Sequence, residues 1–101
     1  MGMISLTFCE ALATGKRLEL RYDGYQRVVE VHTVGRSKEG DWLMRVWQVR
    51  GASAGNEPVG WKLLRIDGSF TAHPINEQSK APRPGYKRGE PAMTGGIKCQ
   101  I

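Results

Sequence analysis

The pattern of apolar and polar positions along the chain changes its period near residue 15. Over residues 5–15 the apolar side chains recur at the three- and four-residue spacing of one helix face. Ser5 or Thr7 is suited to cap the start of such a helix, and Gly15 is suited to end it. We therefore expect one short helix, and its buried face carries Phe8, Ala11 and Leu12.

Beyond residue 15 apolar and polar residues alternate with a period of two, which is typical of strands. The first strand, residues 17–22, is followed by Asp23-Gly24, a strong signal for a tight hairpin turn. A polar, glycine-containing loop is expected over residues 51–58. The remaining strands are expected at residues 26–34, 41–50 and 60–66, with a short strand at 69–71 and a terminal strand at 97–101.

Residues 74–94 differ from the rest, because prolines alternate with lysines and arginines and apolar residues are sparse. We expect one barrel domain over residues 1–73 and an extended C-terminal arm over 74–101. The arm has two possible roles: its cations contact a phosphate backbone, or it wraps around the barrel with Tyr86 as an anchor. We favour wrapping, because the terminal strand needs burial. That strand pairs either in cis or with a second chain, which would make a homo-oligomer.

The spacing of the strands predicts the fold class. A short helix followed by four to six closely spaced strands indicates a mainly β protein, a small β-barrel with one N-terminal helix and an extended C-terminal arm. Closure into a barrel would remove the exposed strand edges on which aggregation starts.

Charge and composition narrow the classes of function. The 101 residues carry a net charge of +5, and the pI is near 9.6, so acidic partners are favoured and nucleic acid first among them. No catalytic motif and no phosphate-binding loop is present, so we expect neither an enzyme nor a cofactor. His32 and His73 stand apart from any metal-ligand spacing, and no metal site is expected.

The two cysteines and the apolar runs bear on compartment. We expect Cys9 to be a small buried side chain, and favour this over a bridge to Cys99. No signal peptide is recognised, and no apolar run approaches the ~20 residues that span a membrane. The sequence therefore predicts a cytoplasmic protein with no membrane contact.

Four blocks follow one another along the chain: Arg17–Tyr22, Arg27–Glu30, Asp41–Met44 and Trp61–Ile66. In this order they resemble the WYL domain family. The resemblance covers roughly residues 10–68 and implies an SH3-like β-barrel, usually the ligand-sensing half of a bacterial transcription regulator, with nucleic acid or nucleotide-like ligands. Arg27 matches the arginine of that family's second block. The chain departs from the family pattern at Val31, Leu43 and Leu64.

Cations within apolar strands suggest that the protein binds an anion. Period two places Arg45 beside Trp47 on one strand face, and Arg65 beside Trp61 on the next strand, with Lys62 opposite. Convergence of these groups would bind phosphate while a ring stacks on a base, as in a nucleotide or single-stranded nucleic acid. The candidate ligand-binding residues are Arg45, Arg65, Lys62, Arg27, Trp47 and Trp61.

Two alternatives stay open at this point. Arg45 and Arg65 would be structural if they pair with acids, for which the candidates are Glu19, Glu30 and Asp67. The chain would be an interaction or assembly module if its C-terminal strand pairs with another chain. On the second strand, Arg27 and His32 are five residues apart and are expected on opposite faces if no bulge intervenes.

Overall fold

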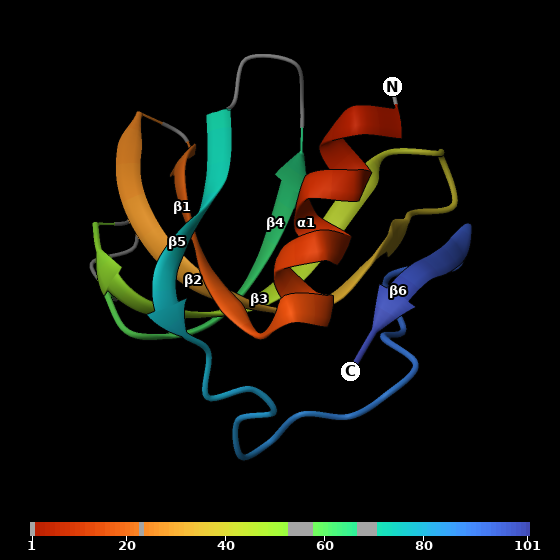
Figure 1. Ribbon diagram of the computed structural model, residues 1–101. Coiled ribbons are helices and arrows are strands. Elements are labelled where there is room, and N and C mark those ends of the chain that lie inside the picture. The colour runs from red at the N-terminus through yellow and green to blue at the C-terminus, as the bar shows by residue number, and fades with distance from the viewer. Residues whose placement is uncertain (1, 23, 53–57, 67–70) are drawn as a thin grey trace.

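The computed structural model describes residues 2–22, 24–52, 58–66 and 71–101, with side chains from Thr7 onward. The protein is mainly β with one short helix (Figure 1). Its elements are α1 (Gly2–Thr14), β1 (Lys16–Tyr22), β2 (Tyr25–Arg36), β3 (Trp42–Gly51), β4 (Gly60–Ile66), β5 (Thr71–Gln78) and β6 (Gly96–Gln100).

All six strands belong to one antiparallel sheet, in the order β4-β3-β2-β1-β5, with β6 paired to β2 off that path. β2 is the longest strand and serves two neighbours on one of its edges. Its first part, Tyr25–Val29, pairs with β1, and its last part, Thr33–Arg36, pairs with β6. The C-terminal strand is therefore inserted in cis, which was the simpler of the two predicted arrangements.

The sheet curls but does not close. β4 and β5 end the pairing path, and in the described part of the chain they do not pair with each other. One side-chain contact crosses the open part of the curl, since the Arg65 amide of β4 donates to the Tyr22 hydroxyl of β1 at 3.1 Å. The predicted closed barrel is not seen in these strands, because no ladder of backbone hydrogen bonds joins β4 to β5.

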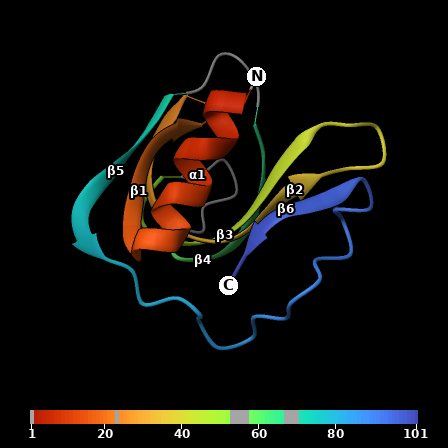
Figure 2. The same ribbon diagram turned by 45° about the vertical axis from the view of Figure 1, so that its right-hand side comes forward.

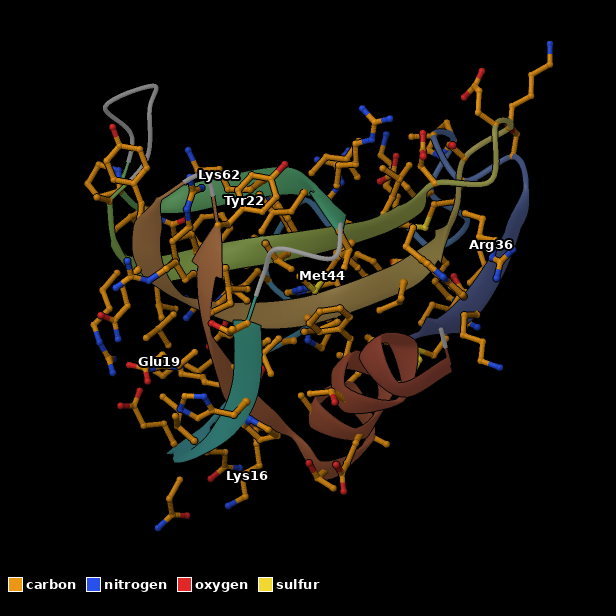
Figure 3. The ribbon with its side chains drawn as sticks, turned by 90° about the horizontal axis from the view of Figure 1, so that it is seen from above. Lys16, Glu19, Tyr22, Arg36, Met44 and Lys62 are labelled. Atoms are coloured by element: carbon orange, nitrogen blue, oxygen red, sulfur yellow. A yellow bond between two sulfur atoms is a disulfide. The ribbon has the colours of Figure 1, made fainter. Side chains whose placement is uncertain are left out.

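Helix α1 lies within the curve of the sheet (Figures 1 and 2). Phe8 and Ala11 are fully buried and Leu12 packs beside them, which confirms the predicted helix face. We call the side of the sheet that faces α1 the inner side, and Met44 lies there, inside the curve (Figure 3). The sheet contributes to this core Leu18, Leu20, Val29, Val31, Val34, Met44, Val46, Leu64 and Ile66.

A disulfide bond joins the helix to the last strand. The sulfurs of Cys9 and Cys99 are 2.07 Å apart and their Cα atoms 5.9 Å apart. The prediction of an unbridged Cys9 was wrong. The two cysteines are separated by 90 residues in sequence, and only the pairing of β6 with β2 brings Cys99 beside α1.

Several predicted boundaries need correction. The helix begins at Gly2 and not at residue 5, upstream of both predicted caps. The fifth strand is Thr71–Gln78 and not 69–71, so the predicted division between residues 73 and 74 falls inside β5. Pro74 is tolerated there because β5 ends the sheet and pairs with one neighbour only. Predictions at Asp23, residues 53–57, the Asp67-Gly68 turn and residues 69–70 lie outside the described residues.

Residues 79–95, which we call the strap, connect β5 to β6 around the side of the sheet away from α1, here called the outer side (Figures 1 and 2). The Ser79 amide donates to Gly15 at 2.7 Å and the Gly95 amide donates to Arg36 at 2.8 Å, so both ends are fixed. Near the end of the strap the side chain of Met93 is buried, with 4% of its surface exposed.

No helix in the described ranges has the length and hydrophobicity of a membrane span.

Candidate functional site

The strap covers a buried carboxylate on the outer side of β2. Glu30 has no exposed side-chain surface, and the Arg83 guanidinium binds it with two nitrogens, at 2.6 and 3.1 Å. Arg17 Nε donates to the same carboxylate at 3.0 Å and the Lys80 amide at 2.8 Å. Burial alone raises the pKa of Glu30, but the hydrogen bonds from Arg83, Lys80 and Arg17 outweigh it and hold the pKa below 4.5.

The charges around Glu30 continue across the sheet as an alternating row. Arg17 also donates to Glu77 of β5 at 3.2 Å, and Arg50 of β3 binds Glu77 through two hydrogen bonds of 2.8 and 2.6 Å. The order along the row is Arg50, Glu77, Arg17, Glu30 and Arg83. This row ties the strap to β1, β2, β3 and β5.

His32 lies beside Glu30 and is also fully buried. Its Nε2 is 3.0 Å from the Arg83 amide, and its Nδ1 is 3.0 Å from the Glu30 carbonyl oxygen. The ring packs against Trp61 of β4 at 4.7 Å between centroids, edge-on, and against Tyr86 of the strap at 5.1 Å. Burial lowers the pKa of His32 below 6.5, despite the opposing effect of the Glu30 carbonyl and charge.

A pocket of about 420 Å³ opens between the strap and the outer side of β3 and β4. The strap contributes Gly85–Lys87, Glu90 and Pro91, and the sheet contributes Arg45 and Trp61. The rings of Trp61 and Tyr86 are inclined by 25° with centroids 6.4 Å apart, and Trp61 Nε1 donates to the Pro84 oxygen at 3.3 Å. The volume falls in the range of sites that hold small molecules.

Arg45 contributes the central cation of this pocket. Its Nε donates to Glu90 at 2.7 Å, and within the described residues this is its one charge partner. The hydrogen bond from Arg45, opposed by burial and aided by the Ala92 amide, lowers the pKa of Glu90 below 4.5. The Arg45 side chain keeps 28% of its surface exposed, and Lys87 adds a second, exposed cation to the wall.

The structure brings Arg45 and Trp61 together, as the sequence predicted, because β3 and β4 pair in the register Arg45↔Leu63 and Trp47↔Trp61. Trp47 stands behind Trp61 with ring centroids 5.4 Å apart and does not line the pocket. The guanidinium of Arg83 lies 5.4 Å from the Trp47 ring, so Trp47 supports the strap instead.

The other three predicted residues lie elsewhere. Arg65 is two-thirds exposed and pairs with Asp41 at 2.9 Å. Lys62 pairs directly with Val46 and so lies on the inner side, at the same end as Tyr22 (Figure 3). Arg27 is 4% exposed on the inner side opposite Leu20, where its NH1 donates to Gln48 at 3.3 Å. Arg27 and His32 therefore face opposite sides, although the β2–β3 pairing shifts register between Val31 and Thr33, the kind of irregularity that the prediction had assumed absent.

The alternative in which Arg45 and Arg65 pair with acids is met among the described residues by Glu90 and Asp41, and not by the suggested Glu19 or Glu30. The third suggested acid, Asp67, lies outside the described residues. Of the charged pocket residues, the sequence did not point to Glu90, whereas Lys87 is one of the arm's cations that one interpretation assigned to a phosphate backbone. It assigned Tyr86 only an anchoring role, which its hydroxyl does fill by donating to the Ile101 oxygen at 2.9 Å. The sequence feature that pointed to this part of the pocket is the presence of one aromatic residue, Tyr86, among the cations of residues 80–88.

The described residues hold no group of three or more His, Cys, Asp or Glu side chains that could bind a metal ion. Comparison with known protein families, with characterised proteins and with solved structures finds no match to this chain.

Proposed function

We propose that the protein is a non-enzymatic binding module whose pocket takes a nucleotide-like anion, either free or as part of a single-stranded nucleic acid. The observation that carries this proposal is the placement of Arg45 and Lys87 beside the rings of Trp61 and Tyr86 in one pocket. Cations hold a phosphate while aromatic rings stack on a base, and this pairing tolerates any base because every base has a π face.

The charge of the pocket favours an anion over a cation. Arg45 and Lys87 face one carboxylate, Glu90, and that carboxylate already accepts hydrogen bonds from Arg45 and from the Ala92 amide. Only Nε of Arg45 is engaged by a described residue, so its two terminal nitrogens remain for a planar, two-point contact with phosphate. The protein's positive net charge would also attract a polyanion.

The resemblance to the WYL family is consistent with this proposal, because it implies sensing of nucleic acid or nucleotide-like ligands in transcription regulation. We extend the proposal to that role and to an SH3-like origin of the curled sheet. Both rest on the resemblance of the four sequence blocks, and the binding test below bears on the first of them.

Binding is tested by fluorescence anisotropy with labelled single-stranded oligonucleotides, and with a labelled mononucleotide, at two salt concentrations. Lys87→Ala is expected to weaken binding about tenfold, the loss of one charge-assisted hydrogen bond. The matched control is Arg65→Ala, which removes an exposed cation outside the pocket and should leave affinity unchanged. No binding at low salt, or equal losses in the two variants, would overturn the proposal.

Assembly through the C-terminal strand was the alternative function. That strand pairs with β2 of its own chain and is bonded through Cys99 to α1, so it offers no particular support for pairing with a second chain. A homo-oligomer stays a prediction, and light scattering of the purified protein decides it.

The cytoplasmic location expected from the sequence conflicts with the disulfide, because cytosolic thiols are kept reduced. Alkylation of thiols in freshly lysed cells, followed by mass spectrometry, shows whether Cys9 and Cys99 are reduced or bridged in the cell. A bridged Cys9 and Cys99 would place the protein in an oxidising compartment and would favour a free anionic ligand over nucleic acid.

A further inference from the structure

The hydrogen bonds of His32 fix its protonation state. A backbone amide can only donate, so the Arg83 amide, 3.0 Å away, requires Nε2 to be an unprotonated acceptor. The carbonyl oxygen of Glu30 can only accept, so Nδ1, 3.0 Å from it, carries the single ring proton. The imidazole is therefore neutral, and both of its nitrogens are engaged.

A second proton has no suitable place at this site. At Nε2 it would turn the Arg83 amide from a partner into an opposing N–H, in a position with no exposed surface. It would also add positive charge beside the Arg83 guanidinium. Glu30 is the neighbouring anion, but Arg17, Arg83 and the Lys80 amide already occupy its carboxylate.

The groups that face His32 come from several elements. On β2 there is Glu30, with Arg17 of β1 behind it, and on the strap there are Arg83 and the Tyr86 ring. β4 contributes the uncharged Trp61 ring, and the C-terminal residue contributes the Ile101 amide, which donates to the His32 carbonyl at 3.0 Å. Among these, the carbonyl and the carboxylate of Glu30 favour an imidazolium, and burial outweighs both.

The strap has the form of a flap held by its middle. Its two ends are fixed independently of His32, at Ser79 by Gly15 and near Met93 by Arg36 and β6. Between them, residues 80–91 hold to the outer side through the Glu30 and His32 contacts and the Trp61–Pro84 hydrogen bond. The Tyr86 hydroxyl, the Arg45–Glu90 ion pair at 2.7 Å and the hydrogen bond from the Gly89 amide to Gln100 add to these contacts.

We propose that His32 is a proton-operated latch, and that its protonation at Nε2 releases residues 80–91 from the outer side while the inner core stays folded. The lowered pKa of His32 agrees in direction, since a buried neutral histidine must leave its site before it binds a proton readily. Every strap residue that lines the pocket lies within residues 80–91, so opening would also dismantle the pocket. The inference is independent of the proposed ligand, because it is read from the protein alone.

Hydrogen exchange followed by NMR tests the latch between about pH 7.5 and pH 5, above the range in which Glu30 titrates. Protection factors, which correct for the intrinsic effect of pH on exchange, should fall for the Arg83 amide by up to about tenfold per pH unit below 6.5. Amides of β3 such as Val46 should keep their protection. Equal loss in β3 would mean global unfolding and would overturn the latch.

Two glutamine variants distinguish an effect of His32 from an effect of His73. In His32→Gln the side-chain oxygen can accept from the Arg83 amide without titrating, so the protection of Arg83 should lose its pH dependence. The control is His73→Gln, since His73 is the other histidine of the chain and is exposed beside Glu19. This control should behave as the wild type does. A pH dependence that survives in His32→Gln would overturn the latch.

The wild-type protein supplies a test that needs no variant. At neutral pH the nitrogen chemical shifts of His32 should show a protonated Nδ1 and an unprotonated Nε2. As the pH falls, the ring should gain its second proton over the same pH range in which the Arg83 amide loses its protection from exchange. A proton on Nε2 at neutral pH, or a ring that titrates near 6.5 while Arg83 stays protected, would overturn the proposal.

Discussion

Both faces of strand β2 are buried, but by different chemistry. The inner side is closed by α1 with apolar side chains such as Leu18, Val29 and Met44, all without exposed surface. The outer side of β2 is closed by the strap, and there the residues without exposed surface are Glu30, His32 and Thr33. One strand, β2, therefore has a face that packs by shape and a face that depends on hydrogen bonds and charge.

This difference predicts how each side fails. Apolar packing is insensitive to pH and loses stability in proportion to the volume removed. A buried polar network depends on every partner, because a single lost partner leaves the others desolvated and unpaired. The inner side should therefore respond to changes of size, and the outer side to changes of charge.

The largest effect is expected at the disulfide that fastens the inner side. Cys9→Ser with Cys99→Ser opens a covalent loop spanning 90 residues, which should lower the free energy of unfolding by about 4 kcal/mol. Urea unfolding of the oxidised protein, the reduced protein and the double variant measures this. The reduced wild type is the control and should match the variant. A loss much below 2 kcal/mol would mean that β6 is held in place by its pairing with β2 and by the strap.

The next largest effect is expected on the outer side. Glu30→Gln keeps the size of the side chain but removes the charge that Arg83 and Arg17 share, and should cost about 3 kcal/mol, measured by urea unfolding at neutral pH. The matched control is Glu77→Gln, which makes the same change at a partly exposed site and should leave the urea midpoint almost unchanged. Similar losses in the two variants would show that burial under the strap adds nothing.

The sequence was sufficient to predict the inner side. Strict alternation placed Leu18 and Leu20 in the core, and helical spacing placed Phe8 and Ala11 against them, because both patterns are local. Arg45 and Trp61 could be brought together for the same reason, since their strands are neighbours along the chain.

The outer side could not be predicted in this way. Glu30 meets Arg83 across 53 residues and Arg45 meets Glu90 across 45, and no periodicity records which acid a distant arginine will find. The alternation on β2 also assigns Glu30 and His32 to a solvent-facing side, because the pattern carries no information about a strap that returns to cover them. Cys9 and Cys99 escaped prediction for the same reason.

The third prediction concerns acid, and its effect should be confined to the outer side. The folded-state pKa of Glu30 is below 4.5, so its stabilising contribution is complete above 4.5 and is lost as the pH falls below that value. The folded-state pKa of His32 is also lowered, so its contribution is complete above 6.5 and is lost as the pH falls below 6.5. Stability should therefore decline on acidification in two successive windows.

Urea midpoints at about pH 7, 5.5 and 4 measure the two windows. His32→Gln should abolish the loss of stability that begins below pH 6.5, and Glu30→Gln should abolish the loss that begins below pH 4.5. Met44→Ala serves as the control on the inner side: it should cost about 3 kcal/mol at every pH, because it changes volume only. An acid dependence that is the same in all of these proteins would contradict the assignment to the outer side.

The smallest effect is expected at Arg27, a buried residue that breaks the comparison. Arg27 is a charged group on the apolar inner side, 4% exposed, and its Nε has no hydrogen-bond partner among the described residues. Its guanidinium instead lies over the rings of Tyr22 at 5.1 Å and Tyr25 at 5.8 Å, and donates once to Gln48. Arg27→Met would give up these contacts but would also relieve a desolvated cation, so the free energy of unfolding should change by less than about 1 kcal/mol.

Arg83→Met supplies the matched change on the outer side, because it removes the same group where a buried carboxylate depends on it. It should cost about 3 kcal/mol, comparable to the loss of Glu30, and the difference between the two arginine variants measures the contrast between the sides directly. If Arg27→Met costs as much as Arg83→Met, the inner side also depends on charge, and β2 would have two faces of the same kind. If it is neutral, Arg27 is dispensable for folding, and the dependence on charge belongs to the outer face of β2 alone.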